Sequence, residues 1–323
     1  MTDLSTASMS RRRWIQASVA WAAWAGGSSR ADTGGTLRIG FQKGGGLLGL
    51  LKAQGQLEAL LGPQGWQVTW HEFPAGPQLL EALNAGSVDF GYTGAPPPIF
   101  AQAADKDLVY VGAEPGAASS EAIVVKPGSV LRTLAELKGK RVAVQKGSSA
   151  NHLLLAALEH AGVDCADIQP IYLAPADARA AFESDRVDAW SIWDPYLAAV
   201  QAALKVRVLA DYSDLTLTHS FYEARRGFAE SSPAILGPVL QTLAEIGAWA
   251  SSHPDDVAEV LAPQLGLSAQ VVQTWQRRTR YGVQPVDAAV LASQQRVADT
   301  FYAHRLIPQR VDVSRAVWHW ARG

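Results

Sequence analysis

Four short segments of this sequence could do chemistry, because each combines glycine, hydroxyl or aromatic residues with the start of an expected helix. Their candidate residues are Gln42, Gly45 and Gly46, then Thr93 and Gly94, then Ser148 and Ser149, and finally Trp190, Trp193 and Asp194. Backbone N–H groups at a helix N-terminus are unpaired and carry partial positive charge, so they can bind an anion. Glycine lets a ligand approach the backbone closely, and serine or threonine adds a hydroxyl donor. The segments therefore favour non-covalent binding of an anion.

Each segment also has a purely structural interpretation. The glycines after Gln42 can form a simple turn, and they fit neither GxGxxG nor GxxxxGK[ST], which argues against a nucleotide site. Ser148 or Ser149 can be the N-cap of the helix that follows, and Asp194 before Pro195 can cap the next one. One tryptophan of the pair can belong to the core, whereas the two together could form the apolar wall of a pocket.

Composition and missing motifs exclude several classes of function. The sequence contains no HExxH, GxSxG, CxxC or EF-hand motif, and its 7 histidines are scattered. No catalytic residue, cofactor or metal is therefore predicted. A formal net charge of -2 offers no basic surface for a nucleic acid. The single cysteine, Cys165, has no partner for an internal disulfide and is expected to be a small buried residue.

An export signal is predicted over residues 1–31. Arg11–Arg13 precede a short apolar run, Ala17–Ala25, that is too short to anchor the chain in a membrane. Small residues follow up to Ala31, so we expect the mature chain to begin at Asp32. The order of arginines and apolar residues resembles a twin-arginine signal, with Sec export as the alternative.

The elements that must position the candidate residues alternate between strand-like and helix-like stretches, which predicts an α/β protein with largely parallel sheets. Strands are expected at residues 37–41, 67–73, 88–92, 108–113, 122–125, 141–145, 168–173, 187–192, 206–209 and 216–222. After Ala229 the pattern is helical only, which predicts a C-terminal layer of helices at residues 233–251, 254–265, 268–277 and 286–304. A strand, a glycine turn and a helix recur at residues 37–51 and 141–158, so two lobes could face each other across a ligand cleft.

Long ordered stretches of the sequence resemble the periplasmic aliphatic-sulfonate-binding components of ABC importers, within the wider sulfonate, nitrate and taurine type of substrate-binding family. The similar segments are residues 38–44, 73–78, 81–84, 97–104, 145–149, 152–155, 175–182, 192–196 and 301–302. The resemblance spans nearly the whole mature chain. Two departures stand out: Ala95, where relatives commonly have an acid, and the triple glycine Gly44–Gly46.

The resemblance implies a type II periplasmic binding protein, with two α/β lobes joined by a two-strand hinge and extra C-terminal helices. Lobe I would comprise residues 32–116 and 217–323, and lobe II residues 117–216. The crossovers would lie near residues 114–122 and 212–222, and the extra helices would pad lobe I.

The resemblance further implies a monomeric, non-enzymatic protein of the periplasm that captures alkanesulfonates and delivers them to an ABC permease and its ATPase. The expected site uses neutral donors and needs no arginine. The donors would be Gln42, Gly45, Gly46, Thr93, Gly94, Ser148 and Ser149, with Trp190 and Trp193 beside the ligand tail and Asp194 in the same lining. Neutral donors and a permanently charged sulfonate predict an affinity that is nearly flat from about pH 5.5 to 8, the range where histidine would titrate.

Two alternatives stay open at this point. One is an enzyme on the same fold, similar to thiamine-precursor synthases, for which Lys43, Lys146 and His152 would be the candidate reactive residues. The other keeps the binding fold and changes the anion to nitrate, bicarbonate or a sulfate ester.

Overall fold

The computed structural model describes residues 34–43 and 46–318. It contains every predicted strand and every predicted C-terminal helix, with ends displaced by no more than three residues. The predicted export signal at residues 1–31 and the candidate Gly45 lie outside the described residues. Within the described part of the chain, no helix is both long and apolar enough to cross a membrane.

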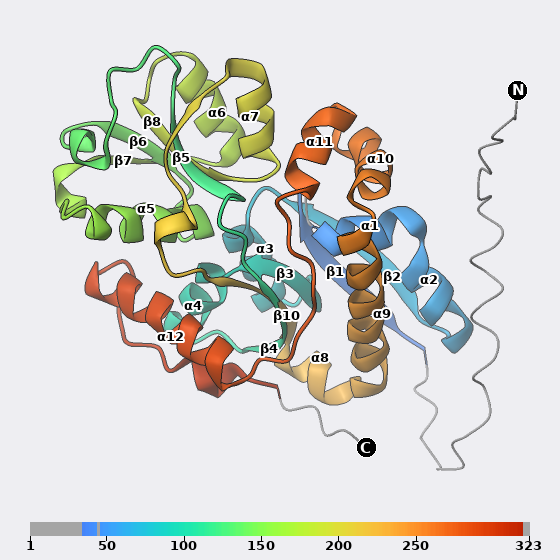
Figure 1. Cartoon of the computed structure of the whole chain (residues 1–323). Helices are drawn as coiled ribbons and strands as arrows, with labels where there is room; N and C mark the ends of the chain where they lie inside the picture. The colour runs from blue at the N-terminus through green and yellow to red at the C-terminus, as the bar shows by residue number, and fades with distance from the viewer. Residues whose placement is uncertain (1–33, 44–45, 319–323) are drawn as a thin grey trace, which may run out of the picture. The chain divides into compact units, whose positions relative to one another are not determined.

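The first sheet has five strands in the order β2-β1-β3-β10-β4 (Figure 1). Its strands are β1 (Thr36–Gln42), β2 (Gln67–Phe73), β3 (Phe90–Gly94), β4 (Leu108–Pro115) and β10 (His219–Arg225). Strand β1 is parallel to β2 and β3, whereas β10 is antiparallel to β3 and β4. The helices that connect the first four strands are α1 (Gly46–Gln54), α2 (Gln56–Leu61), α3 (Gly76–Asn84) and α4 (Pro96–Ala103).

The second sheet repeats this arrangement in the order β7-β6-β8-β5-β9. Its strands are β5 (Glu121–Val125), β6 (Arg141–Val144), β7 (Gln169–Tyr172), β8 (Ala189–Trp193) and β9 (Arg207–Ala210), and its helices are α5 (Ser149–His160), α6 (Pro175–Glu183) and α7 (Tyr196–Leu204). Strand β6 is parallel to β7 and β8, and β5 is antiparallel to β8 and β9. The expectation of largely parallel sheets is confirmed, because four strands of each sheet run in one direction. Only β10 and β5, which each enter a sheet directly from a crossover, run against their neighbours.

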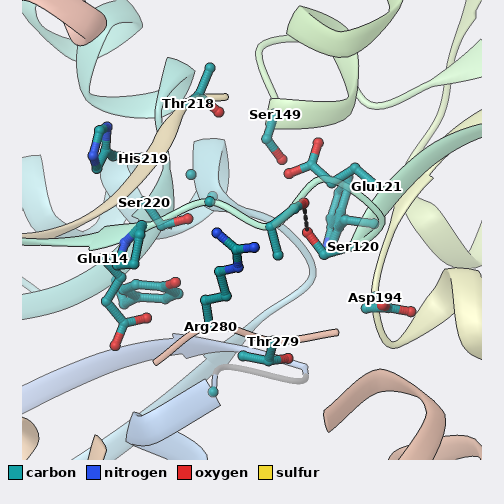
Figure 2. Close-up of a pocket in the computed structure, with 18 of the residues that line it drawn as sticks. Glu114, Ser120, Glu121, Ser149, Asp194, Thr218, His219, Ser220, Thr279 and Arg280 are labelled. Carbon is teal, nitrogen blue, oxygen red and sulfur yellow. Dashed lines mark hydrogen bonds between the residues drawn. The ribbon is translucent and has the colours of Figure 1, made fainter. Parts of the chain in front are cut away.

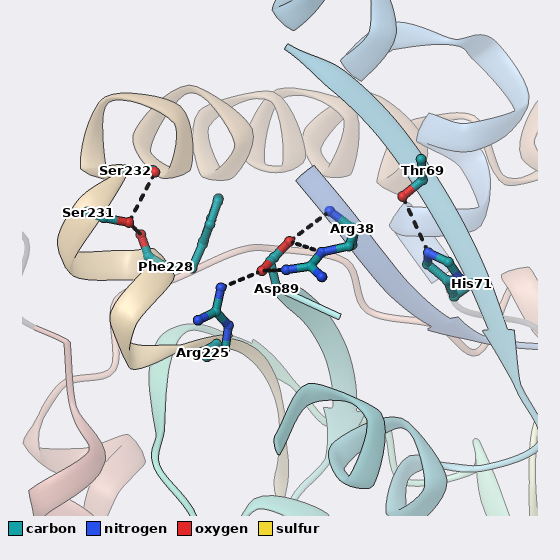
Figure 3. Close-up of polar contacts among 8 residues, drawn as sticks. All are labelled: Arg38, Thr69, His71, Asp89, Arg225, Phe228, Ser231 and Ser232. Carbon is teal, nitrogen blue, oxygen red and sulfur yellow. Dashed lines mark hydrogen bonds and ion pairs between the residues drawn. The ribbon is translucent and has the colours of Figure 1, made fainter. Parts of the chain in front are cut away.

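An arginine–aspartate pair occurs at the equivalent place in both sheets. In the first sheet the Asp89 carboxylate, just before β3, accepts hydrogen bonds from Arg38 Nε and one terminal nitrogen, both at 2.8 Å, and from Arg225 at 2.9 Å (Figure 3). In the second sheet Asp188, just before β8, accepts from Arg141 at 3.2 and 3.0 Å. Each pair joins the outer end of one parallel strand to its neighbour and so secures the register of the sheet.

The chain crosses between the sheets over residues 116–120 and returns over residues 211–218, close to the regions predicted for the crossovers. The two crossing segments touch: a Cβ on Gly116 would lie 2.2 Å from the carbonyl oxygen of Thr218. No side chain fits there, so glycine is required for the segments to run side by side.

The C-terminal helices are α8 (Arg226–Ser231), α9 (Pro233–Ser252), α10 (Pro254–Leu265), α11 (Ala269–Gln276) and α12 (Ala288–Ala303). Helices α9 and α10 pack on α1 of the first sheet. Helix α11 packs on α7, and α12 packs on α5, both helices of the second sheet (Figure 1). The packing of α9 and α10 agrees with the expectation that these helices pad the first lobe, and α11 and α12 in addition cover helices of the second sheet.

Candidate ligand-binding site

A pocket of about 140 Å³ lies where strand ends of the two sheets and both crossovers meet (Figure 2). The first sheet contributes Gln42, Gly94 and Glu114, and the second sheet contributes Glu121 and Trp193. A segment after α11 closes another side. The pocket is thus built from parts of the chain that are distant in sequence, which is the placement expected for a ligand site in this class of fold.

Most of the predicted site residues line this pocket. They are Gln42, Gly46, Gly94, Ser148, Ser149, Trp193 and Asp194. Gln42 donates one side-chain N–H to the carbonyl oxygen of Tyr92 at 3.1 Å. That N–H is therefore used within the protein and is not available to a ligand. Gly46 begins α1 with φ of 52°, a left-handed conformation that glycine adopts without strain.

At the N-terminus of α5 the two serines have different roles. The Ser148 hydroxyl accepts from the N–H of Asn151 at 3.2 Å and donates to the carbonyl of Gln145 at 2.7 Å. Ser148 is therefore the N-cap, as its structural interpretation predicts, and its hydroxyl is used by the helix. Among the described residues, no hydrogen-bond acceptor takes the N–H groups of Ser149 and Ala150. These two groups remain available to a ligand.

The structure corrects the expectation for Thr93. Its side chain is fully buried, and its hydroxyl donates to Glu223 Oε1 at 2.6 Å. The N-terminus of α4 also has few donors, because Pro96–Pro98 have no N–H. Ala95, noted as a departure from relatives, is buried, and its carbonyl accepts from Gln294 at 2.7 Å. This strand end therefore contributes the Gly94 backbone, and the Thr93 hydroxyl supports the fold.

Trp190 is the second correction. It is fully buried and packs against Phe182 with ring centroids 5.9 Å apart, in the core between β8 and α6. Side chains alternate along a strand, so residues three apart on β8 point to opposite faces of the sheet. Trp193 can therefore line the pocket only if Trp190 faces away. The second tryptophan of the lining is Trp275 of α11, which the sequence analysis did not select.

The sequence analysis did not select two glutamates, a histidine and an arginine of the lining: Glu114, Glu121, His219 and Arg280. The two glutamates lie at the ends of the predicted first crossover. Because the crossovers border the expected cleft, this position could have identified both residues as part of the site. Arg280 follows α11 in a segment without regular secondary structure, and no sequence motif marks it.

Three carboxyl groups in the lining have raised pKa values. Burial raises the pKa of Glu114 to about 7, although Tyr222 donates to Glu114 Oε1 at 2.8 Å. Burial likewise raises the pKa of Glu121 and of Asp194 to about 7. Carboxyl groups with such pKa values change charge near neutral pH, and the nearly flat dependence of affinity on pH stays a prediction.

Arg280 brings a positive charge to the pocket. Figure 2 shows its guanidinium group pointing into the pocket between Ser220 and Ser120. Within residues 34–43 and 46–318 it makes no hydrogen bond or ion pair. A guanidinium group presents several N–H donors in one plane, which suits an anion with several oxygens. The expected site of neutral donors therefore also contains an unpaired cation.

Comparisons with known proteins identify the family of this chain. Residues 64–257 match the model of the NMT1/THI5-like family. The chain is 50% identical over 283 residues to an aliphatic sulfonates-binding protein of Escherichia coli (strain K12), which covers 87% of this chain and 88% of that protein.

Solved structures are similar over the same extent. The alkanesulfonate-binding protein SsuA from Xanthomonas axonopodis pv. citri bound to MOPS is 46% identical, with a TM-score of 0.84 over 88% of this chain and 98% of that chain. The periplasmic aliphatic sulphonate binding protein SsuA from Escherichia coli is 49% identical, with a TM-score of 0.80 over 88% of this chain and 92% of that chain. The desulfurization enzyme DSZB is 17% identical with a TM-score of 0.65 over 87% of this chain and 96% of that chain, a likeness of fold alone.

Proposed function

The chain belongs to the NMT1/THI5-like family, and we propose that within it this protein is an extracytoplasmic solute-binding protein that captures aliphatic sulfonates for an ABC importer. The observation that carries the proposal is the unpaired Arg280 guanidinium group in the pocket between the sheets. A sulfonate is anionic at every physiological pH and has three oxygens that accept hydrogen bonds. It can therefore satisfy a cation and several N–H donors at once.

The sulfonate would lie between Arg280 and the N-terminus of α5. The N–H groups of Ser149 and Ala150 point from the positive end of that helix, and Gly94 allows the ligand to approach β3 closely. Trp193 and Trp275 would contact the alkyl tail, because both line the pocket and offer apolar surface. Charge-assisted hydrogen bonds are worth about 1.5–3 kcal/mol each, so a few of them suffice for micromolar affinity after the cost of ordering.

The fold is that of a type II periplasmic binding protein, and we propose that its two sheets belong to lobes that close on the ligand. Lobe I would comprise residues 32–116 and 217–323 and lobe II residues 117–216, with the crossovers as the hinge. Hinge closure around a ligand is a common transition in such folds. Export to the periplasm, a monomeric state and delivery to a membrane permease complete the proposal.

The enzyme alternative has no support from the positions of its candidate residues. Lys43 lines the pocket, whereas the His152 ring is buried outside it and its Nδ1 lies 2.8 Å from the Tyr212 hydroxyl. Lys146 lies over the ring of Tyr172, 5.6 Å from its centroid. Cys165 is also outside the pocket lining, with its sulfur 3.6 Å from His304 Nδ1. These groups are not assembled around one reacting centre.

Titration calorimetry with straight-chain alkanesulfonates tests the proposal. We expect binding of ethanesulfonate to octanesulfonate, and a loss of about ten- to hundredfold in affinity for Arg280→Gln, because one charge-assisted contact is removed. Arg277→Gln is the matched control, since Arg277 is exposed, lies outside the pocket and pairs with Asp255 at 3.3 Å.

Nitrate and sulfate esters serve as competitors in the same experiment. Absence of alkanesulfonate binding, together with tight nitrate binding, would reject the sulfonate as ligand and favour the inorganic anion. Equal affinity of the Arg280→Gln and Arg277→Gln variants would reject the role of Arg280.

A further inference from the structure

The return crossover, residues 211–218, borders two cavities. Its Leu217 and Thr218 line the ligand pocket and also a second cavity of about 350 Å³. The other walls of the second cavity come from α5 and α12, which lie side by side in Figure 1. A segment that borders two cavities has fewer packing neighbours than one inside a core. Its position therefore depends on the few specific contacts that hold it.

Tyr212 provides such contacts at the start of the return crossover. It is 3% exposed and lines the ligand pocket. Its backbone N–H donates to the carbonyl oxygen of Ala118 in the first crossover at 3.0 Å. Its hydroxyl oxygen lies 2.8 Å from Nδ1 of His152, and the Thr218 side chain lies within hydrogen-bonding reach of the same hydroxyl. Tyr212 thus joins both crossovers at the wall of the ligand pocket.

His152 connects Tyr212 to helix α5. It lies one turn after Ser149, whose backbone N–H is available to a ligand. The histidine is 7% exposed, and its ring packs against the rings of Tyr212 and Phe301, with centroids 6.1 and 6.2 Å apart. Among the described residues, the contact of His152 with Tyr212 is the one hydrogen bond between α5 and the return crossover. This bond therefore sets the spacing between two walls of the ligand pocket.

We propose that His152 is a positioning residue for the sulfonate site, because its bond to the Tyr212 hydroxyl holds the return crossover against α5. The inference rests on the proposed function, since it concerns the affinity of that same site. His152 does not touch the ligand itself, because its ring lines the second cavity and lies outside the ligand pocket. Without the bond, the crossover is free to shift into the second cavity, and a bound sulfonate loses part of its contacts.

Calorimetry with 1-butanesulfonate tests the proposal on His152→Leu and His152→Asn, two substitutions of similar size. Leucine removes the hydrogen bond, whereas the amide of asparagine offers a polar atom near the position of Nδ1. We expect His152→Leu to weaken binding about three- to tenfold, the usual effect of one hydrogen bond, and His152→Asn to stay within about twofold of the wild type. His160→Asn is the matched control, because the His160 side chain lines the second cavity from the same helix and makes no hydrogen bond or ion pair within the described residues.

Tyr212→Phe removes the same hydrogen bond from its other end. If the two residues act through this bond, a variant with both His152→Leu and Tyr212→Phe binds the sulfonate no more weakly than the weaker of the single variants. Losses of affinity that add in the double variant would overturn the positioning role. Melting temperatures are measured beside the affinities. A lower melting temperature of His152→Leu at unchanged affinity would mean that His152 serves the fold alone, which also overturns the proposal.

The remaining outcomes separate this inference from the proposed function. Equal losses of affinity in His152→Leu and His152→Asn would overturn the role of the hydrogen bond and leave the sulfonate site intact. Failure of the wild type to bind 1-butanesulfonate would overturn the proposed function and this inference with it. If His152→Leu does not fold, Tyr212→Phe decides by itself, because unchanged affinity in that variant overturns the inference.

Discussion

Thr93 and Ser149 are similar hydroxyl residues at neighbouring turns, yet their surroundings give them different roles. Thr93 is buried and donates to Glu223, whereas Ser149 is partly exposed and lines the pocket. Burial raises the pKa of Glu223 well above its ordinary value, which favours the neutral form of that carboxyl group inside the sheet. A hydroxyl at a strand end can therefore support either the sheet or the ligand.

We predict that Thr93→Val lowers stability and leaves ligand affinity nearly unchanged. The substitution removes the donor to Glu223 and leaves a buried oxygen without its partner, at a cost of about 1–3 kcal/mol. Ser149→Ala is the matched change on the pocket side and should alter affinity with little effect on stability. Thermal unfolding and calorimetry measure the two quantities. A tenfold loss of affinity for Thr93→Val at an unchanged melting temperature would contradict the assignment.

The raised pKa of Glu114 predicts a pH dependence of stability. Burial raises this pKa from 4.5 to about 7, so the folded chain binds a proton more tightly than the unfolded chain between those values. The group therefore stabilises the fold fully below about pH 4.5, and this contribution is lost as the pH rises through 7. At about 1.4 kcal/mol per pKa unit, the contribution is at most about 3.5 kcal/mol.

Comparison with Glu114→Gln isolates this contribution. Burial lowers the pKa of His152 to about 4, and this group acts in the opposite direction, since its contribution is lost as the pH falls from 6.5 through 4. Denaturant titrations give the unfolding free energies of both proteins. The contribution of His152 is the same in each, so it cancels when one free energy is subtracted from the other. We expect the unfolding free energy of the wild type minus that of Glu114→Gln to fall between pH 4.5 and 7.5. A difference that stays constant with pH would show that Glu114 has an ordinary pKa.

At the scale of the elements, the two arginine–aspartate pairs offer a comparison within one chain. The Asp89 side chain is 2% exposed and binds Arg38 and Arg225, while the Asp188 side chain is 31% exposed and pairs with Arg141. Burial alone would raise the pKa of Asp89, but hydrogen bonds from Arg38 and Arg225 outweigh it and hold that pKa below its ordinary value. Asp89 thus joins β1, β3 and β10, whereas Asp188 joins β6 and β8.

We predict that Asp89→Asn is far more destabilising than Asp188→Asn. Removing the charge of Asp89 leaves two arginines without their partner and costs about 3 kcal/mol, the low end of the range for buried pairs, because both arginines are partly exposed to water. The more exposed pair is screened by water, so its loss costs about 0–1 kcal/mol. Chemical denaturation of the two variants measures both values. Equal losses would mean that the second arginine and the deeper burial of Asp89 contribute nothing.

At the scale of the whole molecule, function depends on how closely the two sheets approach. Gly94 of β3 lies directly opposite Ser149 of α5: a Cβ on Gly94 would be 2.9 Å from the Ser149 Cβ. This contact joins the first sheet to a helix of the second sheet at the pocket wall. A methyl group there must push the two apart.

We predict that Gly94→Ala weakens sulfonate binding by at least about tenfold and reduces closure, because the added methyl group occupies the contact between the lobes. Small-angle scattering should show a smaller radius of gyration for the wild type on ligand addition and a smaller change for the variant. Gly62→Ala is the control, since no atom lies within 4 Å of the added Cβ and its φ of -53° suits alanine. An unchanged radius for the wild type at saturation would reject closure.

The sequence by itself determined the elements and the class of fold. Apolar periodicity located each strand and each C-terminal helix, because that pattern reflects which faces of an element are buried. Glycine and serine at strand ends located Gln42, Gly94 and Ser149, because local turns and helix starts need those residue types. Family resemblance then supplied the sulfonate as the expected ligand.

The tertiary structure alone decided which side chains meet. The packing of the two faces of β8 placed Trp193 in the pocket and Trp190 in the core, and the pairing of β3 with β10 brought Glu223 to Thr93. Arg280 lies more than 100 residues from most of the other lining residues, so no local pattern could connect them. Charges interact through space, and the packing of distant segments sets their burial. The balance of charge in the pocket therefore became visible only after the chain was folded.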